Sequence, residues 1–69
     1  MTRQTLTAIV YREGDLYVAE CPEIGTASQG ATFEEALRNL QEATELYLEE
    51  FEFKVKSAPM LTTFEVTYA

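Results

Sequence analysis

The sequence predicts a single α+β domain of order βββαβ, in which one helix packs on a small mixed sheet. Three observations predict this class. The chain has 69 residues, which suffices for one domain only. Three short runs of strand-forming residues, separated by turn residues, occupy its first 30 positions. A long helical repeat of apolar residues and one more alternating run follow, which favours a helix that crosses back to the sheet.

Three strands are expected first, at residues 6–12, 16–21 and 24–29. The first run contains Thr, Ile, Val and Tyr with no glycine or proline, as is typical of a strand. Gly14 can take the positive φ of a tight hairpin turn, and Pro22 with Gly25 brackets the next bend. Because these connections are short, we expect the three strands to be antiparallel neighbours.

A helix is expected over about residues 32–52. Thr32 and Glu35 have the spacing of a capping box, which satisfies backbone N–H groups at a helix start. Apolar residues recur at helical spacing, enough to cover one face of a sheet: Phe33, Ala36, Leu37, Leu40, Ala43, Tyr47, Leu48 and Phe51.

Pro59 marks a loop after the helix, and residues 61–68 alternate as a fourth strand does. A right-handed crossover through the helix would bring this strand parallel to a strand of the hairpin sheet, and we expect it beside the first. All elements then belong to one domain, residues 1–69.

The charge and the residue types restrict the function. Twelve Asp and Glu against five Lys and Arg give a net charge of −7, and histidine is absent. The charge repels phosphate backbones, so direct nucleic-acid binding is not expected. Without histidine, the chain lacks the commonest general acid–base group, and the lone Cys21 makes neither an internal disulfide nor a structural zinc site. No signal peptide or membrane span is apparent, and we expect a soluble protein of the reducing cytoplasm.

We expect neither catalysis nor a metal or cofactor. Cys21 has no histidine to activate it, and a half-buried structural cysteine is the more common case than a nucleophile. Ser28 also lacks such a partner, and a role in the turn towards Gly30 accounts for it better.

One helix covers only one face of the sheet, yet the predicted strands are apolar on both faces. Scattered apolar residues are ordinary on protein surfaces, but a contiguous uncovered face favours association with a partner or a second copy, as a dimer or higher oligomer. Aromatic residues often anchor such interfaces. The candidate residues for a partner or oligomer interface are Ile9, Tyr11, Tyr17, Glu20 and Glu23.

Four segments together resemble the HicB-like antitoxin family. They are YVAECPEIG at 17–25, SQGATFEEAL at 28–37, NLQEA at 39–43 and LYLEE at 46–50. Members of that family typically read "YVAxCPEL", "SQGxTxEEAL" and "NxxEAxxLYLEE", and the likeness covers about residues 6–50. The family fold is similar to a truncated ribonuclease H core of order βββαβ.

The resemblance implies an antitoxin that binds and inhibits a small basic HicA-type toxin, which degrades messenger RNA. An acidic surface suits a basic partner. The helix region carries seven of the carboxylates, although a solvated face that maintains solubility also explains such a run. Many members carry a further DNA-binding domain, and since the sequence ends at Ala69 we expect no operator binding by this chain.

Two alternatives remain beside the antitoxin. One is an orphan oligomeric binding or regulatory module, with no toxin partner and no catalytic activity. The other is a two-metal nuclease, which needs a carboxylate on the first strand. Residues 6–11 contain none, so the nuclease is the weakest of the three interpretations.

Overall fold

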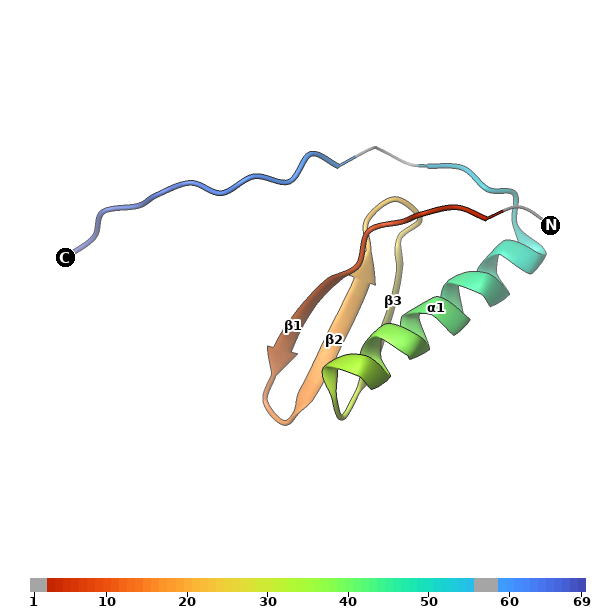
Figure 1. Cartoon of the computed structure of the whole chain (residues 1–69), viewed down its shortest axis with the longest axis horizontal. Helices are drawn as coiled ribbons and strands as arrows, with labels where there is room; N and C mark the ends of the chain where they lie inside the picture. The colour runs from red at the N-terminus through yellow and green to blue at the C-terminus, as the bar shows by residue number, and fades with distance from the viewer. Residues whose placement is uncertain (1–2, 56–58) are drawn as a thin grey trace.

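The computed structural model describes residues 3–55 and 59–69. Its elements are β1 (Ile9–Glu13), β2 (Leu16–Cys21), β3 (Thr26–Gly30) and α1 (Phe33–Glu50) (Figure 1). The α+β class and the order of these four elements are as predicted. The second strand has the predicted bounds, and the helix lies within the predicted range.

The three strands form one antiparallel sheet in the order β1-β2-β3. Ile9 pairs with Glu20 across the first two strands, and Glu20 pairs with Ala27 across the second two. Gly14 closes the first turn with a φ of 62°. Gly25 has a φ of 94° and donates its N–H to the Cys21 carbonyl at 2.7 Å, which closes the second turn. Positive φ favours glycine at both places.

Helix α1 begins with the predicted cap. The Glu35 N–H donates to Thr32 Oγ1 at 3.0 Å, and the Ala31 N–H donates to Glu35 Oε1 at 2.7 Å. These bonds satisfy N–H groups at the helix start that lack partners within the helix. At the other end Phe51 is extended, and its ring stacks on Tyr47 with the centroids 4.6 Å apart.

The core lies between α1 and one face of the sheet. Ala19 and Cys21 of β2 meet Ala36 and Leu40 of α1, and Ile24 closes the cluster from the turn after β2. Mostly small side chains form this core, and among the described residues no large side chain is fully buried. Much of the apolar surface of the chain therefore lies outside the core.

Three features differ from the sequence-based expectation. Residues 6–8 belong to no strand, and β3 begins at Thr26 because Ile24 and Gly25 form the turn. The sheet is antiparallel throughout the described part of the chain, and not mixed. The reason is that the fourth strand expected over 61–68 does not join it.

Residues 59–69 instead form an extended arm that leads away from the body, as Figure 1 shows in blue. The Cα radius of gyration is 14.1 Å, whereas a compact chain of this length has about 11 Å. From Met60 onwards every residue of the extended arm is exposed. Within the described residues, no helix is long and apolar enough to cross a membrane.

Candidate interaction surface

The face of the sheet that α1 leaves uncovered carries an apolar strip. Strand register places Ile9 and Tyr11 of β1 beside Leu16, Val18 and Glu20 of β2 on this open sheet face. Successive residues of a strand alternate between faces, and Ala19 and Cys21 of the same strand are buried under the helix. The open sheet face therefore combines four apolar residues with two carboxylates, Glu20 and Glu13.

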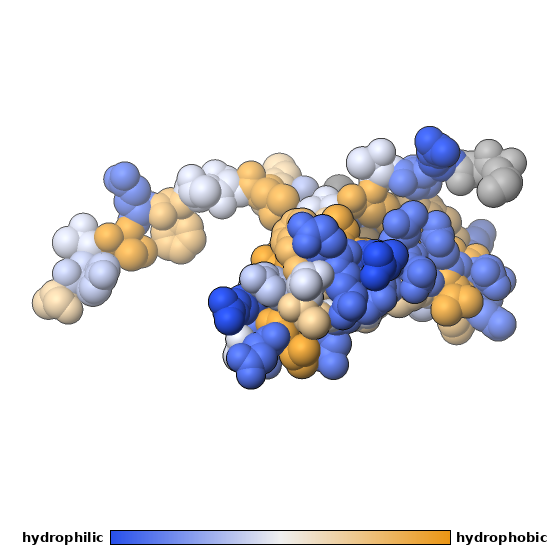
Figure 2. All heavy atoms as spheres, turned by 60° about the horizontal axis from the view of Figure 1, so that its bottom comes forward, coloured by the Kyte–Doolittle hydropathy of each residue, from blue (hydrophilic) through white to orange (hydrophobic). Residues whose placement is uncertain are grey.

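The strip is accessible to a partner. Ile9, Tyr11 and Leu16 are 39%, 42% and 40% exposed. Figure 2 shows apolar residues, in orange, that interrupt the hydrophilic surface of the body and continue along the extended arm. The negative charge of Glu20, together with partial desolvation and the charge of Glu13, raises the pKa of the Tyr11 hydroxyl. The Tyr11 hydroxyl therefore keeps its proton to a higher pH than an ordinary tyrosine does.

Three of the five residues predicted for an interface lie together on this face, namely Ile9, Tyr11 and Glu20. Tyr17 lies on the opposite face, where its ring packs against the core and the Arg12 guanidinium stands 6.0 Å from the ring centroid. Glu23 lies in the turn after β2 and is only 9% exposed.

The Glu23 carboxylate binds other parts of the same chain. Its Oε2 accepts from the Thr7 N–H at 3.0 Å and from the Thr7 hydroxyl at 2.8 Å, and its Oε1 accepts from the Cys21 thiol at 3.6 Å. Burial alone raises the pKa of this carboxyl. Hydrogen bonds from the Thr7 hydroxyl and from the backbone N–H groups of Glu23 and Thr7, with the Cys21 thiol, outweigh burial and hold the pKa below its ordinary value.

A second surface is a groove on the helix side of the molecule, which we call the helix groove. It lies between the extended residues 3–8 and α1 and has a volume of about 1170 Å³. Its apolar lining includes Leu6, Leu37, Leu48 and Phe53. Its wall of residues 3–8 leads directly into β1, which is an edge strand of the described sheet.

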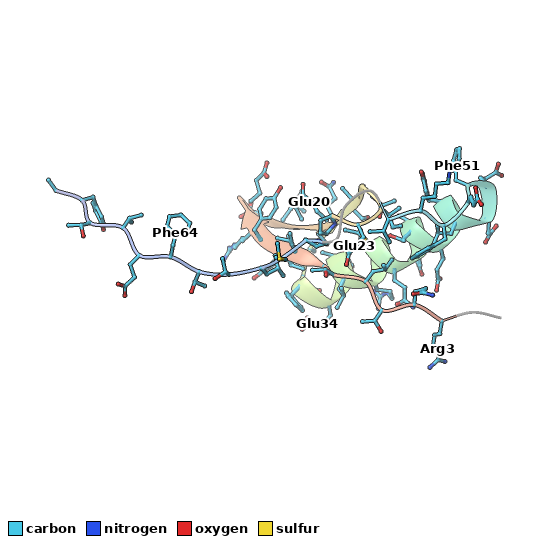
Figure 3. All side chains as sticks on the ribbon, turned by 90° about the horizontal axis from the view of Figure 1, so that it is seen from above. Arg3, Glu20, Glu23, Glu34, Phe51 and Phe64 are labelled. Carbon is cyan, nitrogen blue, oxygen red and sulfur yellow. The ribbon has the colours of Figure 1, made fainter. Side chains whose placement is uncertain are left out.

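Carboxylates dominate the charge around both surfaces. Glu20 lies on the sheet side of the body and Glu34 on the helix side (Figure 3). Within residues 3–55 and 59–69, one ion pair occurs, between Lys54 Nζ and Glu52 at 3.9 Å, and both side chains are well exposed. In the same residues, no three acidic, histidine or cysteine side chains are placed to hold a metal ion together.

Sequence reasoning missed two parts of these surfaces. Leu16 and Val18 belong to the open sheet face but were not among the predicted interface residues, although alternation along the strand groups them opposite Ala19 and Cys21. The helix groove has no local signal, because it depends on where residues 3–8 run relative to α1.

Comparison with known proteins identifies the family. The chain is 36% identical over 70 residues to a UPF0150 protein of Helicobacter pylori strain J99, which covers 93% of this chain and 97% of that protein. It is also 36% identical over 59 residues to a UPF0150 protein of Synechocystis sp. strain PCC 6803, which covers 83% and 86% of the two chains. The chain belongs to the UPF0150 family.

A second UPF0150 protein of Synechocystis is 59% identical over 34 residues, 48% of this chain and 43% of that protein. No family model matches the chain, and no solved structure matches it.

Proposed function

We propose that this protein is a HicB-like antitoxin, which binds a small basic ribonuclease toxin of the HicA type in the cytoplasm and inhibits it by occupying its RNA-binding surface. The observation that carries this proposal is the open sheet face, where exposed Ile9, Tyr11 and Leu16 lie beside Glu20. Apolar anchors with adjacent carboxylates suit a partner whose own surface is basic, because the charges guide encounter and the anchors slow dissociation.

The resemblance of four sequence segments to HicB-like antitoxins supports the same proposal. Two of these segments form the framework of the fold rather than a site. YVAECPEIG covers β2 and its following turn, and SQGATFEEAL covers the end of β3 and the capped start of α1. A shared framework supports a shared fold, for which we propose the truncated ribonuclease H core, and it leaves the choice of partner to the exposed residues.

The inhibition in this proposal needs no chemistry from the antitoxin. A carboxylate such as Glu20 mimics the negative charge of an RNA phosphate, and the Tyr11 hydroxyl oxygen can accept a hydrogen bond beside it. A toxin surface that binds RNA through Lys and Arg would donate hydrogen bonds to both groups.

Binding to a purified small basic HicA-type protein, taken from the neighbouring reading frame where one is present, tests the proposal. We expect the wild-type chain to form a stable complex and to relieve toxin-dependent growth arrest. Leu16→Asp should weaken the complex by about 100-fold, because an apolar anchor becomes a charge in the interface. Leu46→Asp is the matched control, since Leu46 is 63% exposed on α1 and lies outside the open sheet face.

Equal loss of binding by Leu16→Asp and Leu46→Asp would contradict the assignment of the open sheet face. Absence of binding by the wild-type chain would contradict the antitoxin function and favour an orphan binding module without a toxin.

A further inference from the structure

The extended arm has the pattern of a strand that packs on one side only. Phe64, Val66 and Tyr68 share one face, and Thr63, Glu65 and Thr67 share the other. Phe64 is 85% exposed and Tyr68 is 88% exposed, and Figure 3 shows Phe64 far from the body of the chain. An isolated strand of this composition is not stable in water, because its backbone and its apolar side chains need a partner.

The helix groove has an apolar lining that suits this strand face. It is lined on the α1 side by Leu37, Leu40 and Leu48, and on the other side by residues 3–8, which lead directly into the edge strand β1. This is the place that a right-handed crossover assigns to a fourth strand after βββα. The chain itself lines the groove only as far as Phe53 before the extended arm leads away.

The charge distribution favours a second copy as the source of that fourth strand. The chain as a whole carries −7, so two copies repel each other through most of their surfaces. Residues 59–69 contain one charged side chain, Glu65, and it lies on the face opposite Phe64. The extended arm is thus the part of one copy that an acidic second copy can accept.

We propose that two copies of this chain exchange their extended arms. Residues 61–68 of each copy lie in the helix groove of the other as a fourth strand parallel to β1, with Phe64, Val66 and Tyr68 against α1. Each arm and each groove is then used once, which closes the assembly as a two-fold dimer. The exchange completes a mixed four-stranded sheet and leaves the open sheet face accessible on both copies.

Mixing of labelled and unlabelled full-length chains tests this arrangement without any substitution. In a dimer made of ¹³C-labelled and unlabelled chains, isotope-filtered nuclear Overhauser spectra should connect the rings of Phe64 and Tyr68 in one chain with the methyl groups of Leu6 and Leu37 in the other. Finding these contacts only within one chain would overturn the exchange, since the arm would then close on its own groove. Finding none would overturn the docking itself.

A pair of variants on opposite faces of the arm gives the second test. By light scattering we expect the wild-type chain at twice the 7.8 kDa of one copy. Phe64→Asp should weaken dimerisation by at least about 100-fold, because it places a charge in an apolar groove at two symmetric sites. Thr63→Asp adds the same charge on the solvent face and should keep the dimer.

Dimers of unchanged strength for both variants would overturn the proposal, as would a wild-type monomer. If Phe64→Asp lost its helical circular dichroism signal, the wild-type nuclear Overhauser contacts would decide alone. The antitoxin function is measured separately, because Leu16→Asp changes the open sheet face and leaves the groove and arm unaltered.

Discussion

The Glu23 carboxylate holds together two segments that are 16 residues apart in the sequence. It accepts hydrogen bonds from the N–H and the hydroxyl of Thr7 and from the thiol of Cys21. These bonds fix residues 3–8 beside the turn after β2. A carboxylate that is nearly buried is stable only when hydrogen bonds replace its lost water, and here several do so. Glu23 therefore positions the wall of the helix groove.

Acid should loosen this contact. The pKa of Glu23 is lower in the folded chain than its ordinary value of 4.5. The stabilisation is therefore fully present above about pH 4.5, and it is lost as the pH falls towards the folded pKa, because protonation removes the charged acceptor. We expect the free energy of unfolding to fall over this range, and Glu23→Gln to show a smaller fall. Denaturant unfolding at a series of pH values measures it.

The matched control for the acid effect is Glu65→Gln. Glu65 lies on the extended arm, where no hydrogen bond to its side chain occurs in the described structure. The Glu65→Gln chain should therefore show the same dependence of the free energy of unfolding on pH as the wild type. An acid slope in Glu23→Gln equal to that of the wild type would show that the Thr7 contact contributes no pH-dependent stability.

At the scale of elements, the segment SQGAT at residues 28–32 forms the junction between β3 and α1. A methyl carbon at Gly30 would lie 2.6 Å from the Ala36 backbone nitrogen and 2.9 Å from the Glu35 carbonyl carbon. Glycine is needed here for the close approach of strand and helix, and not for an unusual φ. Two residues later Thr32 caps the helix. One short segment therefore sets both the distance between α1 and the sheet and the residue at which α1 begins.

Gly30→Ala should lower the free energy of unfolding by about 1–3 kcal/mol, because the helix start must move away from the sheet. Thermal or denaturant unfolding measures the change. Gly14→Asn is the control: Gly14 also has a special role, but nothing lies within 4 Å of its added carbon, and Asn tolerates its positive φ. A Gly30→Ala chain as stable as Gly14→Asn would mean that β3 and α1 can separate at little cost.

Local pattern was sufficient wherever neighbouring residues decide the structure. Gly14 and Pro22 bracket β2, whose bounds were predicted, and Thr32 with Glu35 fixed the start of α1. The first strand was predicted too early because Thr7 donates its N–H to Glu23 and not to a sheet neighbour. No period in the sequence reports that contact, since its partner is distant along the chain.

The same reasoning explains the site. Alternation along β1 is enough to place Ile9 and Tyr11 on one face, and register adds Glu20. Tyr17 lies on the other face because it shares the parity of Ala19 and Cys21, and this face is the one that α1 covers. For residues 61–68 the alternating pattern predicted the extended conformation correctly. A strand also needs a sheet edge to pair with, and the sequence pattern does not say which edge that is.

At the scale of the whole molecule, the open sheet face and the extended arm are separate apolar surfaces. Further exposed apolar residues lie on α1 and directly after it. The two apolar surfaces are distinct, so self-association through the arm and toxin binding through the sheet need not compete.

Salt should slow the proposed toxin association. A chain of charge −7 attracts a basic partner over distances that salt screens. We expect the association rate constant to fall about tenfold between about 50 mM and about 500 mM NaCl, with a much smaller change in the dissociation rate constant. Stopped-flow or surface-based kinetics measures both. An association rate that does not depend on salt would mean that the net charge plays no part in recognition.

The strand order has a consequence for the time course of folding. Each strand pairs with the next along the chain, and α1 packs mainly on β3, which directly precedes it. Such local contacts form fast, so the body can fold while the chain is still being synthesised. The arm follows later, when the groove is already formed. Folding of the body would then be a rapid first-order step. Exchange of the arms between two copies would be a slower second-order step, whose rate depends on the concentration of the protein in the cell.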